Sequence, residues 1–378
     1  MKLLEYKAHD VFRKYGVASI DGYTVSSSEE LAELDPRYPV VIKAQVETGN
    51  RGKAGGIKFA ENREELLGYG EQILGMSIKG LPVHRVFITP KVEFTREMYL
   101  SFTMDRKTKL GVMIFSPIGG MDINEIAEEN PDTVAKVLIP PGDGIPNYML
   151  QYVLDKTGLE TEYAEEFKEL CQKLYKAYLQ EDCLLAEINP LVVTSDGHLR
   201  ALDGKIDIDD NALYRHPEMA EFRDEMTDNP LILDARKYDF LYIPIKEVGN
   251  IAVVSNGSGM IMSSIDLISK RGMEVTCALD LGGGATAERI QEALRIVASN
   301  ERVDTIFVNI FGGITRCDDI ARGVEASFAD ISSKRLVIRL EGTNKELGLE
   351  IIESIEGDIE LVDGLYEGVD TLAKGLTV

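Results

Sequence analysis

Short apolar runs alternate with amphipathic segments along the second part of the chain. The apolar runs predict buried strands at residues 250–255, 274–281, 303–311 and 335–340. Segments with a helical repeat follow at residues 260–270, 285–299 and 318–329. In the second segment, Ile290, Ala293, Leu294 and Val297 fall on one face. Repeated strand–helix units of this kind predict a parallel sheet covered by helices.

A glycine-bearing junction follows each of these strands. The junctions are residues 256–259, 282–284, 312–313 and 341–344. Ligands of parallel sheets bind at the carboxyl ends of the strands, where such junctions meet. Residues 256–259 precede a helix that could hold an anion, but Met262 stands where a dinucleotide motif has glycine. NAD is therefore disfavoured, and the glycines could equally be simple turn residues.

The first region, residues 1–240, mixes helices and strands without that alternation, which predicts an α+β fold. Residues 1–16 combine acidic, basic and apolar positions, which predicts a helix and not a secretory signal. Residues 217–230 are rich in charge and predict an exposed connection. We therefore expect two domains, residues 1–240 and an α/β domain at residues 245–378.

Composition narrows the classes of function. The net charge is −23 and no run of Lys and Arg occurs, which argues against a nucleic-acid partner. No apolar run has the length that spans a bilayer, so we expect no membrane partner and a cytoplasmic location. The widely spaced cysteines predict free thiols; they are Cys171, Cys183, Cys277 and Cys317. The histidines lie in no metal-spaced cluster and predict structural or exposed side chains; they are His9, His84, His198 and His216.

A strand with one lysine precedes a basic, glycine-rich turn. Residues 40–46 predict a strand that carries Lys43, and residues 49–56 contain Arg51 and Lys53 among glycines. Glycine lets backbone N–H groups approach phosphate oxygens, and the cations can neutralise phosphate charge. No GxxxxGK[ST] motif occurs here, so this is not a Walker A loop. A phosphate site and an exposed basic hairpin both fit the local chemistry.

Oxygen-bearing side chains gather on a second predicted hairpin. Residues 186–191 and 202–205 flank a turn near residues 195–197, which predicts antiparallel strands. Glu187 and Asn189 share one face of the first strand, and Asp203 comes from the neighbouring strand. Mg²⁺ on a nucleotide prefers one or two protein oxygens with phosphates and water. A plain polar hairpin face is the alternative. Since the chain shows no evident nucleophile, a partner chain is expected to supply one.

Six blocks of sequence together resemble the β subunits of succinyl-CoA synthetases, in the same order and over essentially the whole chain. The blocks are residues 4–8 (LEYKA), 43–56, 187–191 (EINPL), 202–205 (LDGK), 281–286 (LGGGAT) and 309–314 (NIFGGI). The resemblance implies an N-terminal ATP-grasp fold followed by a C-terminal flavodoxin-like CoA-ligase domain with a parallel sheet.

The resemblance also implies an acid–thiol ligase that acts only with an α subunit. In that family, ATP with Mg²⁺ phosphorylates a histidine of the α chain, which also carries CoA. Succinate, CoA and ATP then give succinyl-CoA, ADP and phosphate, a step of the tricarboxylic acid cycle. The assembly would be one αβ pair or a heterotetramer. Two alternatives stay open: a sister ligase for malate, itaconate or another dicarboxylate, and a catalytically weakened ATP-grasp chain with a regulatory role.

The family's functional residues map onto matching positions of this chain. By resemblance, the nucleotide contacts are Lys43, Asn50, Arg51, Gly52 and Glu97. The Mg²⁺ ligands would be Asn189 and Asp203, and Glu187 would steady the phosphohistidine. The loops for the substrate carboxylate would contain Asn256, Gly313, Ile314 and Thr315.

The chain departs from the family pattern near the expected base site. Residues 89–91 read Thr-Pro-Lys where the family has an acid that contacts the nucleotide, which puts base recognition in question. Ile20 replaces the glutamine that is typical of GDP users and favours adenine. Thr315 stands where the family frequently has valine. This difference would fit either a different dicarboxylate substrate or no change in substrate.

Overall fold

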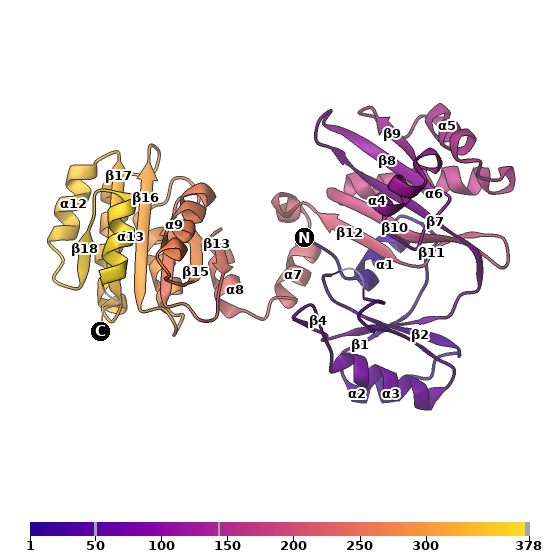
Figure 1. Ribbon diagram of the computed structural model, residues 1–378, viewed down its shortest axis with the longest axis horizontal. Coiled ribbons are helices and arrows are strands. Elements are labelled where there is room, and N and C mark those ends of the chain that lie inside the picture. Colours follow the sequence, from indigo (N-terminus) through magenta and orange to yellow (C-terminus); the bar gives the residue numbers. More distant parts are fainter. Residues whose placement is uncertain (49–50, 143, 375–378) are drawn as a thin grey trace. The chain divides into compact units, whose positions relative to one another are not determined.

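The computed structural model describes residues 1–48, 51–142 and 144–374. The chain forms two compact units, Met1–Ala220 and Glu221–Val378 (Figure 1). The division falls earlier in the chain than the limits 1–240 and 245–378 that the sequence pattern suggests. The reason is that α8 (Pro230–Arg236) packs against β13 (Leu241–Pro244) and α10 (Ala287–Ala298) of the second unit.

A four-stranded antiparallel sheet occupies one part of the first unit, in the order β1–β6–β2–β3. Its strands are β1 (Tyr23–Val25), β2 (Val40–Ala44), β3 (Ile57–Ala60) and β6 (Val86–Pro90). Helices α2 (Ser28–Glu33) and α3 (Arg63–Leu74) begin after Ser27 and Asn62, whose side chains accept N–H groups of the first turn. The helices cover one face of this sheet (Figure 1). Strand β2, which carries Lys43, is central and fully buried.

A second antiparallel sheet of the first unit runs in the order β11–β10–β7–β8–β9, and β12 also pairs with β10. Its strands are β7 (Phe94–Asp105), β8 (Leu110–Ser116), β9 (Ala135–Ile139), β10 (Cys183–Thr194), β11 (Leu199–Ala201) and β12 (Gly204–Ile208). The helices of this part are α1 (Glu5–Lys14), α4 (Ile123–Glu129), α5 (Asn147–Thr157) and α6 (Ala164–Gln180). Strands β4 (Ser77–Ile78) and β5 (Leu81–Pro82) form a small hairpin. The predicted N-terminal helix is confirmed as α1.

The hairpin predicted at residues 186–205 is confirmed in its antiparallel pairing. Glu187 lies opposite Lys205 of β12, and Leu191 lies opposite Ala201 of β11. The position predicted for Asp203 was wrong in one respect. It lies in a bend between β11 and β12 and not within a strand, because the returning chain divides into two short strands there.

The second unit contains a six-stranded sheet in the order β13–β15–β14–β16–β17–β18. Its strands are β13 (Leu241–Pro244), β14 (Ile251–Ser255), β15 (Val275–Asp280), β16 (Thr305–Gly312), β17 (Arg335–Gly342) and β18 (Ile359–Leu361). All pairs are parallel except β13 with β15. The parallel strands thus follow the flavodoxin-like order 2-1-3-4-5. The four strands predicted from apolar runs are confirmed, and the edge strands β13 and β18 were missed.

Helices cover both faces of this sheet. Alternate strand residues such as Val254 and Val308 face a core that includes Ile290 of α10 and Ile320 of α11. The intervening residues, such as Val253, face α9 and α13. The helices are α9 (Ser258–Lys270), α10 (Ala287–Ala298), α11 (Cys317–Ile331), α12 (Lys345–Glu353) and α13 (Leu365–Lys374). Because both faces are buried, the strands are nearly all apolar, and this produced the predicted pattern.

The charged stretch at residues 217–230 is less exposed than predicted. Residues Pro217–Glu225 form helix α7, and Met219 and Phe222 are buried. The division between the two units falls inside this helix. The prediction rested on charge content and overlooked these two apolar positions, which are three residues apart and so lie on one side of a helix.

Candidate functional site

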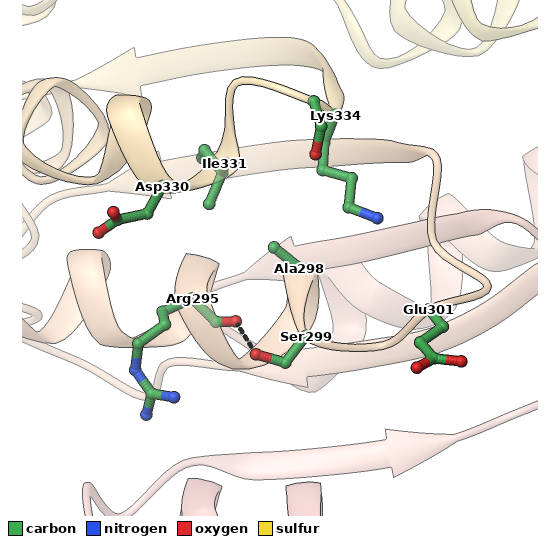
Figure 2. Close-up of a pocket in the computed structure, with 8 residues that line it drawn as sticks. Arg295, Ala298, Ser299, Glu301, Asp330, Ile331 and Lys334 are labelled. Carbon is green, nitrogen blue, oxygen red and sulfur yellow. Dashed lines mark hydrogen bonds between the residues drawn. The ribbon is translucent and has the colours of Figure 1, made fainter.

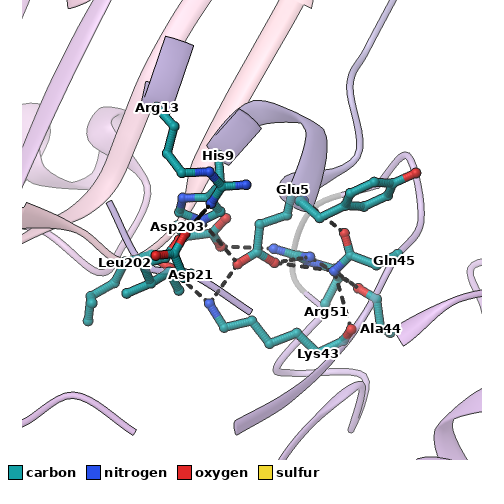
Figure 3. Close-up of polar contacts among 12 residues, drawn as sticks. Glu5, His9, Arg13, Asp21, Lys43, Ala44, Gln45, Arg51, Leu202 and Asp203 are labelled. Carbon is teal, nitrogen blue, oxygen red and sulfur yellow. Dashed lines mark hydrogen bonds and ion pairs between the residues drawn. The ribbon is translucent and has the colours of Figure 1, made fainter. Parts of the chain in front are cut away.

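Four charged side chains of the first unit meet in one cluster (Figure 3). Glu5 Oε1 accepts a hydrogen bond from Lys43 Nζ at 2.6 Å, and Glu5 Oε2 accepts one from Arg51 Nη1 at 2.6 Å. The other end of Arg51 reaches Asp203, with Nη2 to Oδ2 at 2.9 Å. Lys43 also donates to the carbonyl oxygen of Leu202 at 2.9 Å. We call Glu5, Lys43, Arg51 and Asp203 the charge cluster.

Each member of the charge cluster comes from a different element. Glu5 stands in the first turn of α1, Lys43 on β2, Arg51 in the turn after β2, and Asp203 in the bend before β12. The ion pair between Arg51 and Asp203 therefore joins residues that are 152 positions apart in sequence. The cluster contains two cations and two carboxylates, so its formal charge is balanced, as a buried set requires.

The pKa values reflect this balance. Burial by itself would raise the pKa of Glu5, but Lys43 and Arg51 outweigh burial and hold it well below its usual range. The pKa of Asp203 is raised by burial and by the Glu5 carboxylate, and Arg51 opposes this only in part. Asp203 is therefore the carboxylate of the cluster that gains most from an additional cation.

A second polar group lies on β10 and β7. The Tyr99 hydroxyl donates to Glu187 Oε2 at 2.8 Å, and burial raises the pKa of Glu187. The side chain of Asn189 accepts from the backbone N–H of Gly120 at 2.8 Å and donates to the Met121 carbonyl oxygen at 3.0 Å. Glu97 faces the same loop, since a Cβ on Gly120 would lie 2.8 Å from Glu97 Oε2. The loop at residues 119–121 thus joins Asn189 to Glu97.

The donor set fits a hard divalent cation that also binds phosphate. The backbone N–H of Asn189 donates to the Asp203 carbonyl oxygen at 3.3 Å, so the two residues are neighbours. Arg51 occupies one carboxylate oxygen of Asp203, and a carboxylate can accept a cation on the other. Among the described residues, no group of three or more His, Cys, Asp or Glu side chains could hold a metal alone. One carboxylate and one amide oxygen suit Mg²⁺ that takes its other ligands from phosphates and water.

The glycine-bearing junctions of the second unit converge at the carboxyl edge of its sheet. The side chain of Asn256 donates to the Phe311 carbonyl oxygen at 2.9 Å and accepts from the Phe311 N–H at 3.2 Å. Thr315 is buried, and its hydroxyl oxygen accepts from the Gly284 N–H at 3.2 Å. The side chain of Ile314, the residue before Thr315, is 84% exposed. These contacts hold the loops after β14, β15 and β16 together.

The sequence-predicted residues therefore fall into three groups. Lys43, Arg51 and Asp203 meet in the charge cluster, and Glu97, Glu187 and Asn189 lie on the adjoining strands β7 and β10. Gly52 lies in the turn beside Arg51, and Asn50 lies outside the described residues. Asn256, Gly313, Ile314 and Thr315 belong to the loops of the second unit. Their contacts with ligands stay predictions.

Sequence reasoning assigned no role to Glu5. Glu5 lies in the family block at residues 4–8, but an acid in the first turn of a helix is ordinarily explained by the helix dipole, so the block pointed to no contact for it. His9 was expected to be structural or exposed, and it is fully buried against Phe12 and Phe87, with Nε2 3.7 Å from Glu5 Oε1.

A hollow of about 270 Å³ lies between the ends of α10 and α11 (Figure 2). Both of its cations have partners, since Arg295 pairs with Asp234 and Lys334 donates to the Val303 carbonyl oxygen. Lys334 directly precedes β17 and Val303 lies two residues before β16, so the hollow is at the edge opposite the glycine-bearing junctions. This hollow therefore adds nothing to the sites described above.

Comparisons with known proteins define first the class and then the family. Residues 2–193 match the ATP-grasp domain family and residues 254–362 match the CoA-ligase family. The chain thus joins an ATP-grasp domain to a CoA-ligase domain, the composition of an ATP-dependent CoA ligase. Of the helices that the described residues form, none is both long and apolar enough to cross a membrane.

Relatives named succinate–CoA ligase [ADP-forming] subunit beta match the chain over nearly its full length. Those of Bacillus subtilis (strain 168) and Persephonella marina are each 38% identical; the first match covers 99% of this chain and 100% of the relative, and the second 97% of each. The chain therefore belongs to the family of β subunits of ADP-forming succinate–CoA ligases. An ATP citrate lyase structure from Methanothrix soehngenii shares the fold, with a TM-score of 0.81 at 16% identity and 99% coverage of both chains.

Proposed function

We propose that this chain is the nucleotide-binding subunit of a succinate–CoA ligase that completes its reaction with an α-type partner chain. The observation that carries the proposal is the charge cluster, in which Lys43 and Arg51 lie beside Asp203. Cations next to a carboxylate that favours a further cation are what a metal-bound nucleotide requires. The membership in the ligase family supplies the reaction class.

Lys43 and Arg51 would bind the phosphate groups of ATP or ADP. A guanidinium can bind two phosphate oxygens at once, whereas an ammonium acts as a compact charge. Asn189 and Asp203 would hold Mg²⁺, which neutralises phosphate charge when it is bound. To do so, Asp203 must share or release Arg51. Glu97 lies close enough to the 119–121 loop to fix that loop over the same site.

The acceptor of the phosphoryl group would be a histidine of the partner. His9 lies near the charge cluster but offers a poor alternative, since it is fully buried between aromatic rings. Glu187 would accept the N–H of the incoming imidazole and fix its orientation. Its bond from Tyr99 holds the carboxylate in place.

The loops at residues 256, 284 and 313–315 would bind the substrate carboxylate through backbone N–H groups. Their mutual hydrogen bonds support this role, since they keep the loops in a fixed arrangement. The Thr315 side chain is buried and accepts from the Gly284 N–H, so it would shape the substrate site by holding two of its loops together. CoA would be held mainly by the partner chain.

A coupled assay tests the proposal. The complex with the cognate α-type chain is given Mg²⁺, CoA, ATP or GTP, and succinate, malate or itaconate. We expect a CoA thioester with ATP and preferentially with succinate. A preference for another acid would assign the chain to a sister ligase. A folded complex that makes no thioester with any combination would refute the ligase proposal and indicate a regulatory ATP-grasp chain.

A further inference from the structure

Glu5 joins the two cations of the charge cluster through one carboxylate. Oε1 accepts from Lys43 and Oε2 accepts from Arg51, each at 2.6 Å (Figure 3). The side chain of Glu5 is 2% exposed, and those of Lys43 and Arg51 are each 11% exposed. Each carboxylate oxygen therefore fixes one cation in a nearly dry site.

The two cations need such a partner. Lys43 stands on a central strand, whereas Arg51 stands in the turn that follows it. Both are long side chains with much rotamer freedom, and like charges repel strongly where water is scarce. Without a carboxylate between them, the cations would separate toward solvent. Arg51 is held further by its bond to the Ala44 carbonyl oxygen at 3.1 Å.

Glu5 also links α1 to the oxygen-rich hairpin. Arg51 donates hydrogen bonds to both Glu5 and Asp203. Lys43 donates to both Glu5 and the Leu202 carbonyl oxygen. Gln45 supports the same carboxylate, with Nε2 at 3.5 Å from Oε2. The position of both cations relative to Asp203 is thus fixed by contacts that begin at Glu5.

We propose that Glu5 is a positioning residue of the nucleotide-phosphate site, which holds Lys43 and Arg51 side by side so that both meet the phosphate groups together. This inference rests on the proposed function of the two cations. Glu5 acts through them, since its own carboxylate is covered by both. Because the cations are ordered before the nucleotide arrives, binding costs less conformational entropy. Glu5 therefore strengthens binding of the phosphates and leaves binding of the nucleoside part unchanged.

The test compares ADP with adenosine on the full chain. Glu5→Gln keeps the shape of the side chain and removes the charge that both cations share. We expect ADP, in the presence of Mg²⁺, to bind at least about tenfold more weakly by isothermal titration calorimetry. Adenosine, which has no phosphate, should bind as it does to the original chain. A general loss of structure would weaken both ligands equally.

Matched variants separate the outcomes. Asp10→Asn removes a carboxylate from the same helix that pairs with Arg13 outside the cluster, and it should leave both affinities unchanged. Glu5→Asp keeps the charge balance and is expected to fold even if Glu5→Gln does not. Its shorter side chain cannot hold both cations, so ADP binding should again fall selectively. Unchanged ADP affinity in a folded Glu5 variant would overturn the positioning role. Absence of ADP binding by the original chain would overturn the proposed function itself.

Discussion

At the scale of single residues, the candidate site depends on the mutual neutralisation of buried charges. The half-buried Asp203 depends on this sharing, because among the described residues it forms an ion pair with Arg51, which also pairs with the buried Glu5. The pKa of Asp203 is raised by burial and by Glu5, so a further positive charge beside it is favourable. A residue with this environment is suited to bind a metal ion that arrives with phosphate.

Replacing Asp203 tests the metal role directly. We expect Asp203→Asn to lower Mg²⁺-dependent phosphoryl transfer from ATP to the partner chain by roughly 100-fold, because the amide offers the cation no charge. The measurement is the transfer of labelled γ-phosphate, with circular dichroism to check the fold. Asp196→Asn, in the exposed turn of the same hairpin, should retain the full rate. Unchanged transfer in Asp203→Asn would remove this residue from the metal site.

A second residue-scale prediction concerns acid stability. Hydrogen bonds from Arg215, and secondarily from His216, lower the pKa of Asp182 to about 2. A lowered carboxylate pKa stabilises the fold above the pKa of the unfolded chain, about 3.9, and this stabilisation is lost as the pH falls toward about 2. At pH 7, Asp182→Asn should therefore lower the melting temperature by roughly 2 °C, a modest effect because the pair is partly exposed.

The same variant should come closer to the original chain as the pH falls from about 3.9 toward about 2, since Asp182 is protonated in the unfolded chain below about 3.9 but in the native chain only near 2. Asp182 has a φ of 49°, which Asn tolerates well, so the substitution isolates the charge. Melting curves from pH 7 to pH 3 check the prediction. A difference that is constant over this range would show that the charge of Asp182 is not the cause.

At the scale of elements, the carboxyl edge of the parallel sheet depends on close backbone packing. Gly312 at the end of β16 lies opposite Gly342 at the end of β17. Gly342 has a φ of 125°, and a Cβ there would collide with the Gly312 carbonyl oxygen. Only glycine fits this position, and the arrangement brings the loops at residues 313–315 and 343–345 together.

Gly342→Ala should therefore destabilise the second unit by about 2 kcal/mol or more, because both the backbone conformation and the space are unfavourable. Gly283→Ala is the matched control in a neighbouring junction, since a Cβ on Gly283 meets nothing within 4 Å. Chemical unfolding of the two variants measures the difference. Equal stability of both would contradict the packing argument.

At the scale of the whole molecule, each unit has a core that excludes solvent from reactive groups. All four cysteines are free and buried, two in each unit. Burial raises the pKa of Cys277 to about 11 and also raises the pKa of Cys171, Cys183 and Cys317. The thiolate is the reactive form, so both burial and protonation protect these side chains.

We expect the native chain to react very slowly with a thiol reagent at pH 8, whereas the chain unfolded in guanidinium exposes all four thiols at once. The measurement is the number of thiols that react per chain over time in the two states. Fast reaction of one thiol in the native chain would show that its part of the core opens readily.

The amino-acid sequence by itself determined the elements whose pattern is local. The strands β14 to β17 could be predicted because both of their faces are buried, and the intervening helices because apolar residues repeat with the helical period. Strands β13 and β18 were missed since edge strands are short and partly exposed. The resemblance to a ligase family, read from six blocks, also came from sequence and was confirmed by the full-length relatives.

Only the tertiary structure decided which charges meet. Lys43 and Arg51 are marked by a basic, glycine-rich turn, and Asp203 by an oxygen-rich hairpin, so each could be identified from its neighbours in sequence. Glu5 lies in the family block at residues 4–8, but its neighbours in sequence indicate no chemistry for it, since an acid at the start of a helix is common. Its importance follows from where α1 places it, between a strand at residue 43 and a bend at residue 203. The folded structure determines which charged residues that are distant in sequence form ion pairs, because the energy of an ion pair depends on distance in space and not on separation along the chain.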